Sequence, residues 1–262
     1  MDEQSLKELL DTWVDRYNRP EFIEDDPIAI PHAFASRDDI EIAGFLVSTI
    51  AWGNRKAIVR SGHRLIGLLD HAPADYVRHA SQEELHRLRR FVHRTFNGED
   101  VIAFLLAIRS MMERFGGIGL FFEQVYRESG DMRVAIDRFR IEFFRREHPA
   151  RCEKHLSCIS RGAACKRLNM YIRWMVREDD RGVDFGLWKT IPPAALYLPL
   201  DLHSGEMGRA LGLLHRKQND WKAVEEITVA LRRFDAADPV RYDFALFGAG
   251  MSGFLKCEDA VR

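Results

Sequence analysis

One lysine and one aspartate stand where an amine nucleophile and an assisting carboxylate would be placed. Lys166 follows the small residues of "RGAAC", at the head of an apolar, aromatic-rich helix predicted over residues 166–176. A helix N-terminus disfavours a positive charge, which favours a neutral, nucleophilic amine at that position. Such an amine can form a Schiff base with a sugar carbon. The alternative is an ordinary solvated surface lysine.

The aspartate lies at the junction of an apolar run and a predicted helix start. In "LYLPLDLHSGEMGRALGLL", Asp201 follows Leu200, and an apolar "ALGLL" comes behind it. Taken alone, Asp201 is best explained as a helix N-cap, because its side-chain oxygen can accept a backbone N–H bond. A capping carboxylate is also ionised and pre-oriented, so it can serve both purposes. His203 is expected to be structural and to hold the turn after Asp201.

Together these segments resemble the helix-hairpin-helix DNA glycosylases. "GAACK" resembles the hairpin of that superfamily, with Gly162, Ala164 and Lys166 in register, and "PLDLHSGEMGRALGL" resembles its D-x-H segment. Lys166 and Asp201 are 35 positions apart, a spacing similar to that of the archaeal 8-oxoguanine DNA glycosylase branch and a related bacterial family. The resemblance extends over residues 30–255 and implies that Lys166 attacks the sugar C1′ while Asp201 stabilises the developing charge.

The resemblance also implies a binding site for the damaged base. Asp243 and Phe247 of "RYDFALFGAG" match a D-x-x-x-W pair that holds the flipped base, with Phe in place of Trp. Arg173 matches a basic residue seven positions after the catalytic lysine. Asn54 or Arg55, in "IAWGNRKAIV", is a candidate for filling the gap that the flipped base leaves in the duplex. Gly162 and Ala164 would contact the DNA backbone. The alternatives are a first-turn helix carboxylate for Asp243, a core aromatic for Phe247 and a helix end at Gly53.

The elements that must position these residues are predicted to be helices. Apolar periodicity, capping signals and Gly or Pro stops indicate an all-α protein of roughly ten helices. The clearest lie in residues 5–17, 36–53, 97–116, 131–149, 219–239 and 239–254. We expect Ser36, Asn97 and Asn219 or Asp220 to begin helices, and Gly116 and Pro149 to end them. Residues 1–262 are expected to form one glycosylase-like unit of two interleaved helical lobes, with the cleft between them.

Composition narrows the class of protein. Lys and Arg number 39 against 40 Asp and Glu, so the chain does not bind nucleic acid through bulk positive charge. Cys152, Cys158, Cys165 and Cys257 match no common zinc or iron–sulfur spacing and are expected to be reduced thiols. We expect a cytoplasmic monomer with no membrane segment, no cofactor, no metal and no iron–sulfur cluster.

The leading hypothesis from the sequence is a bifunctional DNA glycosylase and AP lyase. It would act on damaged DNA containing oxidised purines such as 8-oxoguanine. One alternative is a noncatalytic nucleic-acid-binding helical protein of the same fold, and another is a helical scaffold with no nucleic-acid role. Convergence of Lys166, Asp201, Asp243 and Phe247 at one place would distinguish the first hypothesis from the other two.

Overall fold

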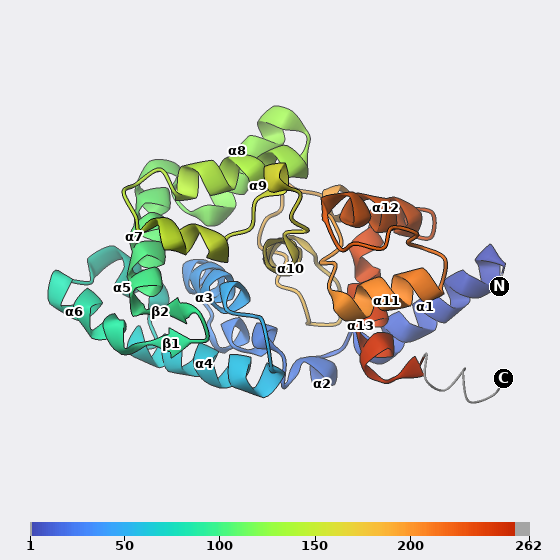
Figure 1. The fold of residues 1–262 in the computed structure, drawn as a ribbon, viewed down its shortest axis with the longest axis horizontal. Helices are drawn as coiled ribbons and strands as arrows, with labels where there is room; N and C mark the ends of the chain where they lie inside the picture. The colour runs from blue at the N-terminus through green and yellow to red at the C-terminus, as the bar shows by residue number, and fades with distance from the viewer. Residues whose placement is uncertain (1, 255–262) are drawn as a thin grey trace. The chain divides into compact units, whose positions relative to one another are not determined.

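The computed structural model describes residues 2–254, and the described chain is helical apart from one short hairpin (Figure 1). The predicted all-α class is therefore confirmed. The chain divides into two compact units, each built from segments that are distant in sequence. Unit 1 comprises residues 1–22, 159–186 and 191–262, and unit 2 comprises residues 23–158 and 187–190. The first boundary between the two units lies between residues 22 and 23, within the short helix α2 (Pro20–Ile23).

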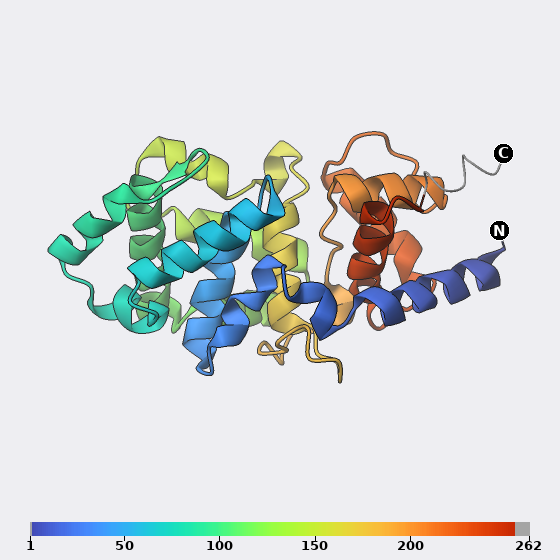
Figure 2. The same cartoon turned by 90° about the horizontal axis from the view of Figure 1, so that it is seen from below.

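Unit 1 contains the N-terminal helix and the C-terminal third of the chain. Its elements are α1 (Glu3–Tyr17), η5 (Ile159–Arg161), α10 (Lys166–Val176), η6 (Pro193–Ala195), α11 (Leu202–Ala210), α12 (Trp221–Arg232), η7 (Pro239–Tyr242) and α13 (Asp243–Met251). Helix α13 packs against both α1 and α11, and Figure 2 shows α1 in dark blue passing beside α13 in red. Gly248 permits close packing of α13, because a Cβ there would overlap the ring of Tyr17. Within this packing, His203 near the start of α11 lies against Gly250 near the end of α13.

Unit 2 is also helical and has a core rich in phenylalanine. Its elements are η1 (Pro27–Ala29), η2 (Pro31–Ala33), α3 (Arg37–Thr49), α4 (Arg55–Leu68), α5 (Pro73–His79), α6 (Gln82–Arg87), η3 (Leu88–Arg90), β1 (Val92–His93), β2 (Phe96–Asn97), α7 (Gly98–Phe115), α8 (Ile118–Ser129), α9 (Met132–Phe143) and η4 (Ala150–His155). Strands β1 and β2 pair antiparallel, with His93 opposite Phe96. The rings of Phe45, Phe104 and Phe143 contact one another at centroid distances of 5.0–6.1 Å.

Most helix boundaries follow the capping signals in the sequence. Ser36, Asn97 and Asp220 each accept a backbone N–H bond at a helix start, as predicted. Gly116 ends α7 in the left-handed conformation, with φ of 83°. These boundaries were predictable because a cap is a hydrogen bond between residues close in sequence.

The end of α9 differs from the prediction. The helix ends at Phe143 rather than near Pro149. The chain then folds back on α9, where the Arg140 guanidinium binds both the Glu153 carboxylate and the Leu156 carbonyl. This tertiary contact has no local signal in the sequence.

Two further expectations concern the oxidation state of the cysteines and the absence of a membrane-spanning helix. Cys152, Cys158 and Cys165 are thiols rather than disulfides, and Cys257 lies outside the described residues. Burial and the neighbouring Asp100 carboxylate raise the pKa of the Cys152 thiol to about 12. No helix within residues 2–254 is both long enough and apolar enough to cross a membrane.

Candidate active site

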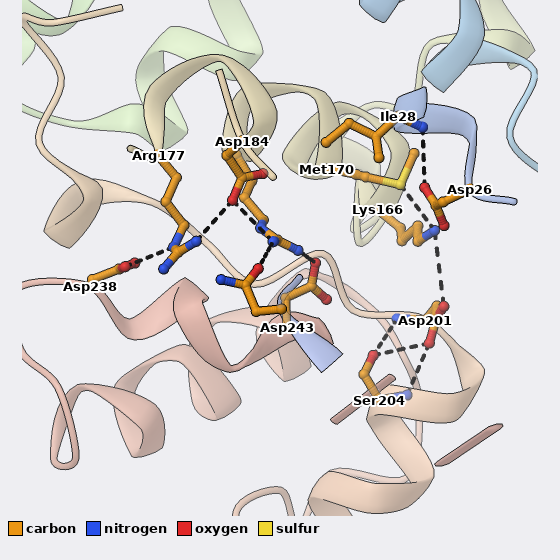
Figure 3. Close-up of polar contacts among 12 residues, drawn as sticks. Asp26, Ile28, Lys166, Met170, Arg177, Asp184, Asp201, Ser204, Asp238 and Asp243 are labelled. Atoms are coloured by element: carbon orange, nitrogen blue, oxygen red, sulfur yellow. Dashed lines mark hydrogen bonds and ion pairs between the residues drawn. The ribbon is translucent and has the colours of Figure 1, made fainter. Parts of the chain in front are cut away.

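Lys166 and Asp201 meet within unit 1, each at the start of a helix. Lys166 is the first residue of α10, and Asp201 is the N-cap of α11. The Lys166 Nζ lies 4.0 Å from the Asp201 Oδ2 (Figure 3). Their side chains are 29% and 21% exposed, so solvent or a ligand can reach both. The predicted convergence of amine and carboxylate is present.

The two carboxylate oxygens of Asp201 have different partners. Oδ1 accepts bonds from the Ser204 backbone N–H at 2.9 Å and from the Ser204 hydroxyl at 3.0 Å. The Asp201 N–H donates to the Ser204 Oγ at 2.9 Å, which completes a capping box. Oδ2 is the oxygen that faces the lysine. The capping box therefore orients the carboxylate and leaves one oxygen directed at the amine.

The Lys166 amine has weak partners for a cation. Besides the carboxylate at 4.0 Å, it donates to the Met170 thioether at 3.4 Å, and a thioether is a poor acceptor. The preceding residue, Cys165, adopts the left-handed conformation and provides no side-chain cap for α10. The amine therefore sits at the positive end of a helix dipole, without a short bond to a carboxylate.

Asp243 is electrostatically coupled to this pair. It is the first residue of α13 and is only 6% exposed. Burial raises its pKa to about 6, although Arg173 and Lys166 act in the opposite direction; Asp201 raises it further. Asp243 therefore changes protonation close to neutral pH, unlike an ordinary aspartate.

Arg173 contacts this region through Asp243 and is itself completely buried. Its guanidinium donates to Asp243 at 2.6 Å and to Asp184 at 3.1 Å. Burial opposes its charge, but the two carboxylates outweigh that effect and leave the Arg173 pKa raised. The guanidinium also lies over the Phe244 ring, with 4.1 Å to its centroid. Arg173 is thus surrounded by protein groups, and its predicted role in substrate binding remains a prediction.

Phe247 and His203 lie together on neighbouring helices. Their ring centroids are 5.8 Å apart in an edge-on arrangement. Phe247 is partly exposed, and a Cβ on Gly250 would come within 3.0 Å of the His203 Cβ. His203 therefore packs against α13, and its expected role in holding the turn after Asp201 remains a prediction.

The predicted backbone hairpin forms a tight turn before α10. Gly162 has φ of 79°, a conformation favourable for glycine, and a Cβ there would meet nothing within 4 Å. The Gly162 carbonyl accepts a bond from the Trp221 N–H at 3.0 Å, and the Ala164 carbonyl accepts one from Asn169. Asn54 belongs to unit 2, where it caps α4 through the Ala57 N–H. The DNA contacts expected of Gly162, Ala164 and Asn54 remain predictions.

Three further residues support the site and were not identified from the sequence. Ser204 orients the Asp201 carboxylate, and Met170 contacts the Lys166 amine. The Asn219 side chain donates to the Asp201 carbonyl at 2.8 Å. Ser204 and Met170 lie three and four positions after their partners, so helical spacing could have indicated both. Asn219 has no such signal, because it is 18 residues away.

The fold and site define a helical protein with a partly exposed lysine–carboxylate pair at two helix N-termini. The chain belongs to the family described as "Protein of unknown function (DUF2400)", which it matches over residues 26–252. Among curated proteins no match was found, and none was found among solved structures. The assignment to the helix-hairpin-helix DNA glycosylase superfamily, suggested by the motifs, is therefore wrong. The family matched is a different one, and no comparison relates this chain to a glycosylase.

Proposed function

We propose that Lys166 and Asp201 form an amine-nucleophile site with glycosylase and AP lyase activity on damaged DNA. The observation that carries the proposal is the 4.0 Å approach of the Lys166 Nζ to the Asp201 Oδ2 at a partly exposed position. A lysine with weak partners beside a fixed carboxylate is suited to covalent catalysis at a sugar carbon. The proposal depends on this geometry rather than on family membership.

The chemistry follows from the roles of the two groups. The neutral Lys166 amine attacks the sugar C1′, the bond between C1′ and the base nitrogen breaks, and the base takes up a proton as it leaves. Positive charge develops at C1′, and the ionised Asp201 Oδ2 stabilises that charge. The C1′–O4′ bond of the adduct then breaks, and the ring oxygen takes the remaining amine proton to become a hydroxyl, which leaves an imine at C1′. The imine acidifies the C2′ proton, and loss of that proton expels the 3′ phosphate by β-elimination.

Asp243 and Phe247 are proposed to hold the base after it leaves the helical stack. A flipped base is recognised by hydrogen bonds to its edge and by stacking on aromatic faces. A carboxyl group with a pKa of about 6 can donate or accept such a bond near neutral pH. Phe247 offers a partly exposed ring next to Asp201's own helix. Oxidised purines such as 8-oxoguanine are the proposed bases.

The turn before α10 is proposed to contact the DNA backbone. The segment from η5 through Gly162 to α10 would act as a helix-hairpin-helix element of a two-lobed glycosylase-like fold. The open space at Gly162 and the helix N-terminus behind it suit a phosphate group.

Borohydride trapping tests the proposed activity. The wild-type protein is incubated with oligonucleotides containing 8-oxoguanine or an abasic site, and a covalent adduct is expected. Lys166→Gln should lose the adduct, whereas Lys217→Gln, which alters an exposed lysine of the same unit, should retain it. Absence of any wild-type adduct across damaged and abasic DNA would refute the proposed chemistry.

A further inference from the structure

Unit 2 carries a cluster of cations that the proposed chemistry does not use. Helix α4 presents Lys56, Arg60 and Arg64 at a spacing of four residues, which places them along one side of the helix. Arg94 lies in the turn after β1, a strand that packs on α4, and the Arg90 carbonyl of η3 accepts a hydrogen bond from Arg64 of α4. We call these five exposed residues the basic face.

Among residues 2–254, no carboxylate forms an ion pair with a cation of the basic face. Neither residues 42–69 nor residues 85–98 contain an Asp or Glu. In the described part of the chain, Arg55 pairs with Asp26 and Arg89 pairs with Glu99, and neither arginine belongs to the basic face. The positive charge of the basic face is therefore not neutralised locally. Since the whole chain has a net charge of −1, the charge is distributed unevenly.

Specific contacts hold α4 and the hairpin together as one surface. The Arg64 guanidinium donates to the Arg90 carbonyl at 2.7 Å, and His93 bonds to the Ser61 hydroxyl at 2.9 Å. A Cβ on Gly53 would come within 2.8 Å of the Arg94 Nη1, so the Arg94 side chain lies beside the start of α4. Figure 1 shows β1 alongside α4. The segments that carry these cations are thus joined at both ends of α4.

We propose that the basic face binds the phosphate backbone of duplex DNA. That the polyanion is DNA rests on the proposed function. That the basic face binds a polyanion at all rests only on its positive charges, which no carboxylate among the described residues neutralises. Lys56 to Arg64 span about 12 Å of helix, and a DNA duplex presents about seven phosphate charges over that length. Four of the five cations are arginines, whose planar guanidinium groups suit bidentate phosphate contacts.

The same residues do not suit a membrane surface. A helix that binds lipid needs a free apolar face to bury below the headgroups. Three large apolar residues of α4, Ile58, Leu65 and Ile66, are already buried within unit 2, and Val59 and Leu68 are partly buried. The basic face thus offers charge without an apolar anchor, as expected for a nucleic-acid backbone contact.

Salt-dependent binding to undamaged duplex DNA tests the proposal with the full-length protein. The wild type is expected to bind with a steep dependence of log K on log salt. Lys56→Ala/Arg60→Ala should weaken binding about tenfold and make the slope less steep by about 1.8, because two phosphate contacts are lost. The control Arg16→Ala/Arg127→Ala removes the same charge from exposed positions elsewhere and should bind as the wild type does. Circular dichroism would confirm that both variants remain folded.

The outcomes separate this proposal from the proposed chemistry. Binding of undamaged duplex by the wild type without borohydride trapping would refute only the chemistry. Equal slopes for Lys56→Ala/Arg60→Ala and wild type would overturn the basic face as a DNA surface. Failure of the wild type to bind duplex DNA would also overturn it. The same holds if Lys56→Ala/Arg60→Ala loses affinity for anionic phosphatidylserine vesicles but keeps its affinity for duplex DNA.

Discussion

Two groups of charged residues in unit 1 use the same chemical types in opposite ways. Arg173, Arg177 and Asp184 are almost completely buried and joined by contacts of 3.0–3.1 Å, and Arg177 also reaches Asp238 at 2.7 Å (Figure 3). Lys166 and Asp201 are partly exposed and 4.0 Å apart. The first group is closed to solvent, and short ion pairs join its members. The second has a reachable amine with only weak partners.

The difference shows how burial separates a structural ion pair from a reactive one. In the buried group, opposite charges outweigh desolvation and keep the pKa of Arg177 raised, so its proton is held firmly. A group that cannot exchange its proton or reach solvent contributes to specific packing instead. The Lys166 side chain, by contrast, is 29% exposed and can be reached from solvent. Asp243 belongs to both groups, because Arg173 binds it while Lys166 and Asp201 influence its pKa.

The largest expected loss of stability comes from a substitution that breaks the buried group. Arg173→Met leaves Asp243 without its guanidinium partner and removes one of the two arginines that bind the Asp184 Oδ2. The loss should cost about 3–5 kcal/mol of unfolding free energy. Lys166→Met should change stability by no more than about 0.5 kcal/mol, because the side chain is partly exposed and its ion pair is long. Urea denaturation of both variants measures the difference. Equal losses would contradict the distinction drawn between the two groups.

Two substitutions of Asp201 distinguish its role as a helix cap from its proposed role in the chemistry. Asn caps a helix about as well as Asp, so Asp201→Asn should retain stability while trapping falls by about 10²–10³-fold through loss of the stabilising charge. Asp201→Ala should lose the same activity and also about 1 kcal/mol of stability. Single-turnover trapping and thermal unfolding provide the two measurements. Full activity in Asp201→Asn would show that the carboxylate is only a cap.

Asp243 should make stability depend on pH between about 4 and 6. Its pKa of about 6 in the folded protein exceeds the ordinary value of 3.8, so the folded state binds its proton more tightly. The protonated Asp243 therefore stabilises the folded state by up to about 3 kcal/mol. This stabilisation is fully present below about pH 4 and is lost as the pH rises through 6. Unfolding free energies from pH 4 to 7, with Asp243→Asn as reference, test the sign. The charged groups that act on Asp243 are Arg173, Lys166 and Asp201. A wild type that gains stability over this range relative to Asp243→Asn would contradict the assignment.

The smallest effect concerns the turn that leads to Lys166. Gly162→Ala forces a side chain into the left-handed region and should cost about 1 kcal/mol. Gly130→Ala in unit 2 is a matched control, because it also has positive φ and open space around it. Both variants should lose similar stability, but only Gly162→Ala should reduce trapping. Equal trapping in the two variants would remove the turn from the site.

The sequence predicted parts of the site correctly, but its motifs were misleading about family. Asp201 as a cap and Lys166 at a helix start both follow from local patterns, and the structure has both. The same residues suggested a glycosylase superfamily, which the match to another family overturns. Short motifs of this kind record helix caps and turns, and these local features occur in many folds. The Asn219 contact and the burial of Arg173 had no counterpart in the pattern.

The sequence by itself determined the helical class and the starts of helices such as those at Ser36, Asn97 and Asp220. Caps and apolar periodicity act over three or four residues, so the sequence encodes them directly. Only the tertiary structure decided which charges meet. Lys166 reaches Asp201 across 35 residues and Arg173 reaches Asp243 across 70, and helix packing within unit 1 sets both distances. Burial, which separates the reactive pair from the structural one, is likewise a property of the packed molecule rather than of any segment.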